Sequence, residues 1–423
     1  MIPCTAFLIC LWKAGKVVKN VQKLRGLLSI SLLFGIFFIH LAFIGEIFIE
    51  RKFPVVSMNA FIRTNADFLV WGSLLNGNLK VRDELPKPSL PENYKPADNI
   101  ILVIDESVRG DHLSLNGYKR KTTPFLEELQ AKGILHNWGI AAASTTASIP
   151  SYEMITTGLL PDDLPDKSGR QLRKSPVIFQ YAKAMNYTTY FFDGQMNSFW
   201  GTPNDINYID FYISARQIRA QGNPAENWET DNLISKRVNE IISSSTGNFI
   251  FIFKRGSHVP YQNNYPKNEE FWKPAYNFSN VFEIPAPEHF EEVVNSYDNS
   301  LRFNVDSFFR NLLDGYENLP NRTTILYTAD HGQTFFINGR AAHGGTSKEE
   351  AIVPLFLISS ENIKPDTNYK ASHQNILPTV LDLMKFPEEL RARKYGLSLL
   401  QATAGNNEPR FFNPNCGPKI AFD

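Results

Sequence analysis

Five short runs of aliphatic and aromatic residues restrict what this chain can fold into. The first, at 99–105, reads NIILVID without polar alternation, which is typical of a strand buried on both faces of a parallel sheet. Four similar runs follow: 190–193, 249–253, 323–329 and 353–358. Helix-like stretches lie between them, including 293–313 and one at 124–132 that Thr123 and Pro124 are expected to start. This alternation predicts an α/β fold, a doubly wound sheet with helices on both faces.

Composition excludes several classes of protein. Of the 423 residues, 43% are hydrophobic and 13% aromatic, so the chain can bury a large core and is not disordered. The 43 basic and 43 acidic residues balance, and this gives no field that would attract nucleic acid. The three cysteines, Cys4, Cys10 and Cys416, are too few and too scattered for a disulfide framework or a thiolate zinc site. Any metal in the main body must therefore use histidine and carboxylate ligands.

An apolar run near the N-terminus has the length of a membrane span. Residues 26–45 read GLLSISLLFGIFFIHLAFIG, and the predicted transmembrane helix occupies 26–48. Five basic residues precede the run and only two follow it closely, so 1–25 is expected to be cytoplasmic or interfacial and the remainder to face outward. A cleaved signal peptide is the alternative, but the run is long and has no small-residue cleavage pattern after it.

A juxtamembrane region at 49–98 is expected to join this span to the soluble body. Apolar residues recur at roughly helical spacing over 53–81, which fits either an amphipathic helix at the membrane surface or an ordinary packing helix. The Pro-rich stretch at 84–99 reads as a semi-rigid connector. The catalytic domain is accordingly predicted at 99–423.

Two of the predicted strands end in side chains that can bind a metal. The 99–105 strand runs into Glu106, and the 323–329 strand runs into Asp330 and His331. Functional groups of open α/β sheets lie at the carboxyl ends of strands, and two carboxylates with an imidazole suit Zn²⁺ with a position left open for catalysis. Each fragment alone also fits a helix cap or a loop acceptor, so the hypothesis depends on the two occurring together.

A segment of small and hydroxyl-bearing residues lies between these strands. Residues 141–150 read AAASTTASIP and then become helix-like. A helix that begins near Thr146 would direct its free N–H groups at a phosphate, and a metal could activate a threonine hydroxyl as a nucleophile. A plain Ser/Thr cap and turn is the alternative interpretation.

Two histidines lie in glycine-containing loops at strand ends. His258 follows the 249–253 strand, and His343 stands twelve residues after His331. Either imidazole could donate a hydrogen bond to phosphate oxygens. Four other histidines are expected to be structural or surface groups: His112, His136, His289 and His373.

The ordered set of these motifs resembles the phosphoethanolamine transferases of the alkaline phosphatase and sulfatase superfamily. The resemblance covers about 99–400 and includes 105–109 with 114–118, 144–150, 256–260, 297–299, 330–332 and 343–344. It implies an alkaline phosphatase-like fold and one zinc ion, and leaves a second divalent ion open. The implied zinc ligands are Glu106, Thr145, Asp330 and His331. Thr145, five residues before Pro150, would be the nucleophile, and the implied substrate-binding residues are His258, His343, Asn116 and Arg109.

The resemblance also implies an activity and a location. It predicts transfer of phosphoethanolamine from phosphatidylethanolamine to lipid A, core sugar or another surface glycan through a phospho-threonine intermediate. The protein would lie in a bacterial inner membrane, with its N-terminus cytoplasmic and its catalytic domain periplasmic. Two positions depart from the family pattern: Phe253 replaces a common histidine and Gln333 a common acidic residue. These departures leave the acceptor open.

Other functions remain as alternatives. One is a phosphodiesterase or sulfatase-type hydrolase of the same superfamily, although 148–152, SIPSY, lacks the arginine of a sulfatase nucleophile motif. Another is a catalytically inactive, membrane-tethered binding protein that keeps the fold. Bound zinc separates an enzyme from the inactive protein.

Overall fold

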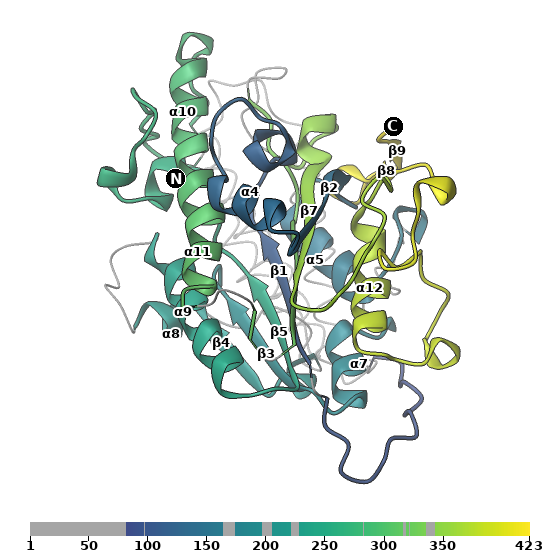
Figure 1. Cartoon of the computed structure of the whole chain (residues 1–423). Coiled ribbons are helices and arrows are strands. Elements are labelled where there is room, and N and C mark those ends of the chain that lie inside the picture. Colours follow the sequence, from purple (N-terminus) through teal and green to yellow (C-terminus); the bar gives the residue numbers. More distant parts are fainter. Residues whose placement is uncertain are drawn as a thin grey trace, which may run out of the picture. The chain divides into compact units, whose positions relative to one another are not determined.

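The computed structural model describes most of the chain after residue 81 (Figure 1). The described ranges are 82–96, 98–163, 174–196, 205–220, 228–281, 283–315, 319–320, 322–335 and 343–423. They belong to a compact unit, Lys80–Asp423. In these ranges no helix has both the length and the apolar surface to cross a bilayer. The segments predicted at 1–25 and 26–48, and the helix at 53–81, lie outside the described residues.

In the described ranges, nine strands and eight α-helices carry the fold. The strands are β1 (Asn99–Asp105), β2 (Leu135–Ala142), β3 (Thr188–Asp193), β4 (Phe211–Ser214), β5 (Asn248–Phe253), β6 (Thr323–Ala329), β7 (Ile352–Ser359), β8 (Phe411–Phe412) and β9 (Ile420–Ala421). The helices are α4 (Pro124–Ala131), α5 (Ser148–Thr157), α7 (Ile178–Ala184), α8 (Ala215–Arg219), α9 (Glu229–Ser244), α10 (Phe290–Leu301), α11 (Phe308–Leu312) and α12 (Ile376–Leu383).

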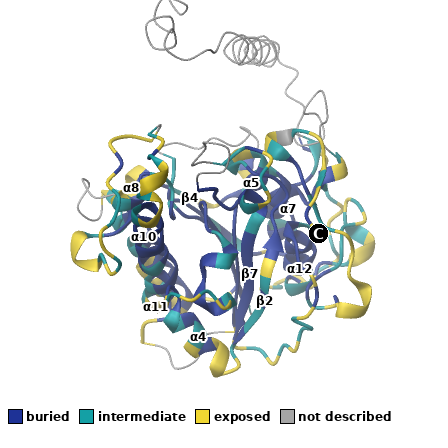
Figure 2. Ribbon diagram, turned by 90° about the horizontal axis from the view of Figure 1, so that it is seen from above, coloured by how far each residue is buried: buried dark blue, intermediate teal, exposed yellow. Residues whose placement is uncertain are grey.

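A seven-stranded sheet forms the centre, in the order β2-β7-β6-β1-β5-β3-β4. Helices α4, α9, α10 and α11 lie on one face, and α5, α7 and α12 on the other (Figure 1). Strands β1, β3, β4, β5 and β6 pair in parallel, whereas β7 pairs antiparallel with both β6 and β2. The α/β architecture is therefore as predicted, but the sheet is mixed. The central strands are buried under both helical layers (Figure 2).

The five predicted strands are all present, and two further strands of this sheet had no clear signal. Strand β2 contains His136, Asn137 and Gly139, which break the apolar run, and its register shifts between Asn137 and Ile140. Strand β4 has four residues, lies at the sheet edge and exposes Phe211. Both are edge strands, where one side stays open and polar residues are tolerated.

The register brings three strand ends to one level. Asp105, the last residue of β1, pairs with Ala329, the last residue of β6, and Ile104 pairs with Phe253 at the end of β5. The residues that follow these strands therefore meet at the carboxyl edge of the sheet. This places Glu106 beside Asp330.

The stretch predicted as one helix at 293–313 contains a π-helical turn, Arg302–Ser307, between α10 and α11. Asp306 of this turn accepts hydrogen bonds from the backbone N–H groups of Phe125 and Leu126 in the first turn of α4. Thr123, the predicted cap of α4, makes no capping bond; its Oγ1 accepts from the Leu115 N–H instead. The carboxylate of Asp306, which is far away in the sequence, thus caps α4 in place of the Thr123 hydroxyl.

The Pro-rich stretch before β1 packs against the core of the compact unit. Its described residues, 84–96 and 98, form no helix or strand, and Leu85, Leu90 and Tyr94 contact the core. Arg82 is buried and forms a two-pronged ion pair with Asp205. The chain is therefore fixed to this unit from residue 82 onward.

A buried ion pair lies where β1 and β5 end. Asp105 and Lys254 are fully buried, and Lys254 Nζ lies 2.5 Å from Asp105 Oδ2. Lys254 Nζ also donates to Asn304 O in the π-helical turn, and the Tyr327 hydroxyl donates to the same Asp105 oxygen. Asp105 Oδ1 accepts from the backbone N–H of Glu106. Burial raises the pKa of the Asp105 carboxyl to about 6, although the Lys254 ammonium opposes this shift.

Loss of the Lys254 ammonium is expected to destabilise the fold, because it leaves the Asp105 carboxylate buried without a counterion. We expect Lys254→Met to lower the free energy of unfolding by about 3–5 kcal/mol near pH 8. The deficit should shrink toward about pH 5.5, because Asp105 with its raised pKa takes up a proton in the folded variant while the unfolded chain does not. Urea unfolding followed by circular dichroism at both pH values measures this.

An exposed ion pair provides the control. Arg237→Met removes the surface contact to Glu240 and is expected to cost less than about 1 kcal/mol. The double variant Lys254→Met with Asp105→Asn should regain part of the lost stability. A Lys254→Met deficit no larger than that of the control, or one that grows on acidification, contradicts this account.

Candidate functional site

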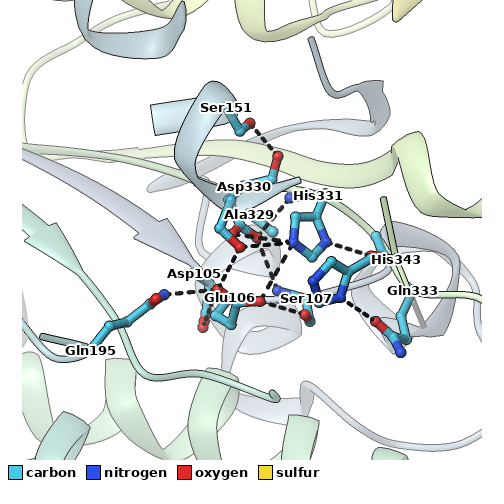
Figure 3. Close-up of polar contacts among 12 residues, drawn as sticks. Asp105, Glu106, Ser107, Ser151, Gln195, Ala329, Asp330, His331, Gln333 and His343 are labelled. Atoms are coloured by element: carbon cyan, nitrogen blue, oxygen red, sulfur yellow. Dashed lines mark hydrogen bonds and ion pairs between the residues drawn. The ribbon is translucent and has the colours of Figure 1, made fainter. Parts of the chain in front are cut away.

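Glu106 is the buried centre of a cluster at the carboxyl edge of the sheet (Figure 3). Its Oε1 accepts from Ser107 Oγ at 2.6 Å. Its Oε2 accepts from Ser148 Oγ at 3.1 Å and from Gln195 Nε2 at 2.8 Å. These donors come from three separate segments, so the orientation of the carboxylate is set by tertiary structure.

The turn after Glu106 is strained. Ser107 has φ of 60°, in the left-handed region that residues other than glycine rarely adopt. Its N–H donates to Asp330 Oδ1 at 3.0 Å, and its carbonyl accepts from the Tyr297 hydroxyl at 2.7 Å. Such strain persists where surrounding contacts enforce it, and it is found preferentially at functional sites.

Asp330 and His331 follow β6 and face Glu106. His331 Nε2 lies 3.5 Å from both Glu106 Oε1 and Asp330 Oδ2. His331 Nδ1 lies 2.7 Å from the carbonyl oxygen of Gly332, so this nitrogen carries the proton and Nε2 has a lone pair. Asp330 Oδ1 accepts from the His331 N–H, whereas Asp330 Oδ2 is buried and has no hydrogen-bond partner among the described residues.

His343 and His258 complete the cluster from two loops. The His343 ring is centred 4.1 Å from that of His331, and its ligand atom lies within 4.8 Å of those of Glu106 and His331. The His258 ring is centred 5.9 Å from His343, and its Nδ1 contacts Val259 O at 2.6 Å. The structure therefore brings both predicted histidines to the predicted metal ligands.

Thr145 lies in the segment before α5 and is fully buried. Within the described part of the chain, its Oγ1 has no hydrogen-bond partner. The next residue, Thr146, accepts at its carbonyl from the Gly344 N–H, which places this segment beside the loop of His343. Thr145 therefore adjoins the cluster by its backbone, and its role as nucleophile and ligand stays a prediction.

The hydroxyl that contacts Glu106 and His331 belongs to Ser148, whereas the sequence predicted Thr145 for this position. It is the first residue of α5, and its Oγ lies 3.1 Å from both Glu106 Oε2 and His331 Nε2. Its distance from Pro150 fits the sulfatase nucleophile pattern, although 148–152 lacks the arginine of that pattern. The start of α5 thus brings the Ser148 hydroxyl to the cluster.

The contacts of Arg109 and Asn116 hold the loop after β1. Arg109 forms an ion pair with Asp111 at 2.6 Å, and its guanidinium lies 5.4 Å from the centre of the Phe335 ring. Asn116 donates to Gly110 O and belongs to a turn rather than to the histidine cluster. Substrate contacts by Arg109 and Asn116 stay predictions.

Gln195 was not found from the sequence. It follows β3, and its Nε2 donates to Glu106 Oε2 and to Lys254 O. The rule that functional groups follow strand ends applies to β3 as well, and polar residues after the 190–193 run were the available signal.

The two predicted acidic ligands have pKa values shifted in opposite directions. Burial raises the pKa of Asp330 well above its usual value, and the Glu106 charge adds to the effect. Burial also opposes ionisation of Glu106, but the nearby imidazoles of His331, His258 and His343 outweigh it and lower the pKa of Glu106. Burial lowers the pKa of His331. The site therefore favours the ionised form of Glu106 and disfavours the ionised form of Asp330.

These residues fit a zinc ion. Carboxylate oxygens and imidazole nitrogens are the donors that Zn²⁺ accepts where no thiolate is near. The buried Asp330 Oδ2 has no hydrogen-bond partner in the ranges that the structure describes, and such an atom calls for an ion or another compensating group. The hydrogen bond from His331 Nδ1 to Gly332 O is the outer contact that commonly orients a histidine ligand.

Comparison with known proteins agrees with the motifs. The Sulfatase family profile matches residues 98–386. Kdo(2)-lipid A phosphoethanolamine 7''-transferase of Escherichia coli (strain K12) is 26% identical over 283 residues, which cover 66% of this chain and 45% of that protein. The chain spans about half the length of the curated relatives it matches.

Solved structures show the same fold. The C-terminal periplasmic domain of EcEptC from Escherichia coli has a TM-score of 0.62 at 20% identity, over 82% of this chain and 97% of that chain. Its complex with Zn has a TM-score of 0.61 at 20% identity, over 81% and 97%. The integral membrane protein EptA from Neisseria meningitidis has a TM-score of 0.63 at 18% identity, over 88% and 72%. The predicted alkaline phosphatase-like fold is confirmed.

Zinc affinity is expected to fall as the pH falls, because the ionised carboxylate of Asp330 is the form that binds a metal and burial raises the pKa of this carboxyl. Protons should therefore compete with zinc at a higher pH than they would at an ordinary aspartate. Calorimetry over a range of pH, in two buffers with different ionisation enthalpies, measures the affinity and the protons released. Asp330→Asn should bind zinc more weakly and with a shallower dependence on pH. An equally steep dependence in both proteins would assign the proton competition to another group.

Proposed function

The chain belongs to the sulfatase family, and from this premise we propose that it is a membrane-anchored, zinc-dependent phosphoethanolamine transferase. The proposed donor is phosphatidylethanolamine, and the proposed acceptor is a hydroxyl of lipid A, core sugar or another surface glycan. The names of the matched relatives support this substrate class. The observation that carries the proposal is the meeting of Glu106, Asp330, His331 and His343 beside the hydroxyl-rich start of α5.

Glu106, Asp330, His331 and Thr145 would hold the zinc ion. When bound, the ion would supply a Lewis acid that favours the ionised threonine oxygen and offsets negative charge on the phosphate. His258 and His343 would neutralise negative charge on the non-bridging oxygens. Donors fixed in place before the reaction usually provide the largest share of transition-state stabilisation.

The transfer proceeds in two steps through the chain's own threonine. Thr145 Oγ1 forms a bond to phosphorus, the bond between phosphorus and the diacylglycerol oxygen breaks, and diacylglycerol leaves with the threonine proton. The acceptor hydroxyl then attacks phosphorus, the bond to Thr145 breaks, and the acceptor proton restores the threonine hydroxyl. Splitting the reaction lets a lipid donor leave before a glycan acceptor binds.

A lipid donor and a lipid-linked acceptor require a site close to a bilayer. We propose a bacterial inner-membrane location, with the span at 26–48, the N-terminus in the cytoplasm and the catalytic domain at 99–423 in the periplasm. Support comes from the matched EptA, described as an integral membrane protein, and from the matched EcEptC domain, described as periplasmic.

Thr145→Ala is expected to abolish the covalent adduct and to lower turnover at least about a thousandfold, because the nucleophilic oxygen is lost. The zinc-loaded full-length protein in detergent is incubated with phosphatidylethanolamine, and peptide mass spectrometry locates the phosphoethanolamine group. Circular dichroism checks that the variant remains folded. Near-normal turnover in this variant would refute the assignment.

Ser148→Ala is the matched control for the second hydroxyl. Ser148 donates to Glu106, so we expect a rate about ten- to a hundredfold lower with the adduct still on Thr145. An adduct on Ser148 would reverse the two roles. Release of phosphoethanolamine to water at the same rate with and without glycan would identify a hydrolase, and absence of both zinc and adduct would favour the inactive binding protein.

A further inference from the structure

His373 is buried between the two segments that carry the site. It was expected to be a structural or surface group, and it is buried, with 2% of its surface exposed. Its Nε2 lies 2.9 Å from Ala329 O, and its Nδ1 lies 3.1 Å from the backbone nitrogen of Ser144. Ala329 directly precedes the predicted metal ligands of β6, and Ser144 directly precedes the predicted nucleophile. The His373 side chain thus joins the segment of the predicted metal ligands to the segment of the predicted nucleophile.

The partners fix the tautomer of this imidazole. A carbonyl oxygen can only accept and a backbone N–H can only donate, so Nε2 carries the proton toward Ala329 and Nδ1 accepts from Ser144. Burial lowers the pKa of His373 to about 3, which keeps the ring neutral. A neutral imidazole offers one donor and one acceptor on a rigid ring.

Each hydrogen bond acts on a peptide group next to a functional residue. Ala329 O belongs to the same planar peptide as the N–H of Asp330, so a bond to this oxygen orients the backbone from which Asp330 departs. On the other side, Ser144 O accepts from the Asn413 N–H while Ser144 N–H donates to His373. The segment before Thr145 is thereby held from two directions.

We propose that His373 is a positioning residue that sets the metal ligands at the end of β6 against the nucleophile segment before α5. This inference rests on the proposed function for the identity of the nucleophile. Its link to the metal ligands does not depend on which substrate is used.

Two conservative variants separate the two ring nitrogens. The side-chain amide of His373→Asn can replace Nδ1 and accept from Ser144, but it is too short to reach Ala329 O. The amide of His373→Gln can replace Nε2 and donate to Ala329 O, and it leaves the Ser144 N–H without its partner. The same two substitutions at His136, a half-buried residue of β2, are the controls.

Zinc affinity reports on the link to β6. We expect the zinc dissociation constant, measured by chelator competition without substrate, to rise about ten- to a hundredfold in His373→Asn. In His373→Gln it should stay within about threefold of the wild type. The His136 variants should match the wild type. A merely structural role of His373 would change zinc affinity equally in both variants.

Adduct formation reports on the link to Thr145. At saturating zinc, the single-turnover rate of phosphoethanolamine transfer to the protein should fall at least about tenfold in His373→Gln, because displacement of a reacting group is costly. In His373→Asn the rate at saturating zinc should be closer to that of the wild type. Thermal unfolding checks each variant.

Equal zinc affinities in the two variants, or equal adduct rates, overturn the proposal. If one variant does not fold, the other decides alone, because each is expected to lose one property and keep the other. If the wild type forms no adduct, the proposed function fails, and the zinc comparison still decides whether His373 positions the ligands of β6.

Discussion

The site depends on β1, β5 and β6 ending at the same level, and the buried pair of Asp105 and Lys254 holds these ends together. Lys254 N–H donates to Ile104 O, and Asp330 N–H donates to Asp105 O, so the backbone pairing extends past each strand. Asp105 Oδ1 approaches Gly256 so closely that a Cβ there would lie 2.2 Å away. The carboxylates of Glu106 and Asp330 owe their common position to this packing.

Charge is arranged around these carboxylates so that a cation is favoured. Glu106 and Asp330 would repel each other if both were ionised, and burial strengthens that repulsion because the local dielectric is low. Imidazoles from two loops face them, and burial together with the Glu106 charge raises the pKa of Asp330. A bound divalent ion would offset this repulsion. The fold thus holds two acidic groups close together in a buried site, although each would be more stable as a separate, hydrated carboxylate.

The sequence predicted the parts of the site that local pattern determines. The 99–105 and 323–329 strands were predicted to the residue because aliphatic runs buried on both faces have a strong signal, and Glu106 and Asp330 follow directly. The sequence pattern could not predict that β7 runs antiparallel to its neighbours, that Asp306 caps α4, or that His373 joins two segments of the site. Each of these depends on contacts with segments far away in the chain.

The two hydroxyls at the start of α5 differ in a way that bears on their roles. Ser148 Oγ already donates to Glu106, so its proton is engaged and it helps to orient that ligand. Among the described residues, Thr145 Oγ1 is buried without a hydrogen-bond partner, which costs about 1–3 kcal/mol unless something compensates it. Asp330 Oδ2 is in the same condition within that part of the chain. The proposed zinc site assigns both oxygens to a single ion, and one cation would satisfy these two of the buried atoms.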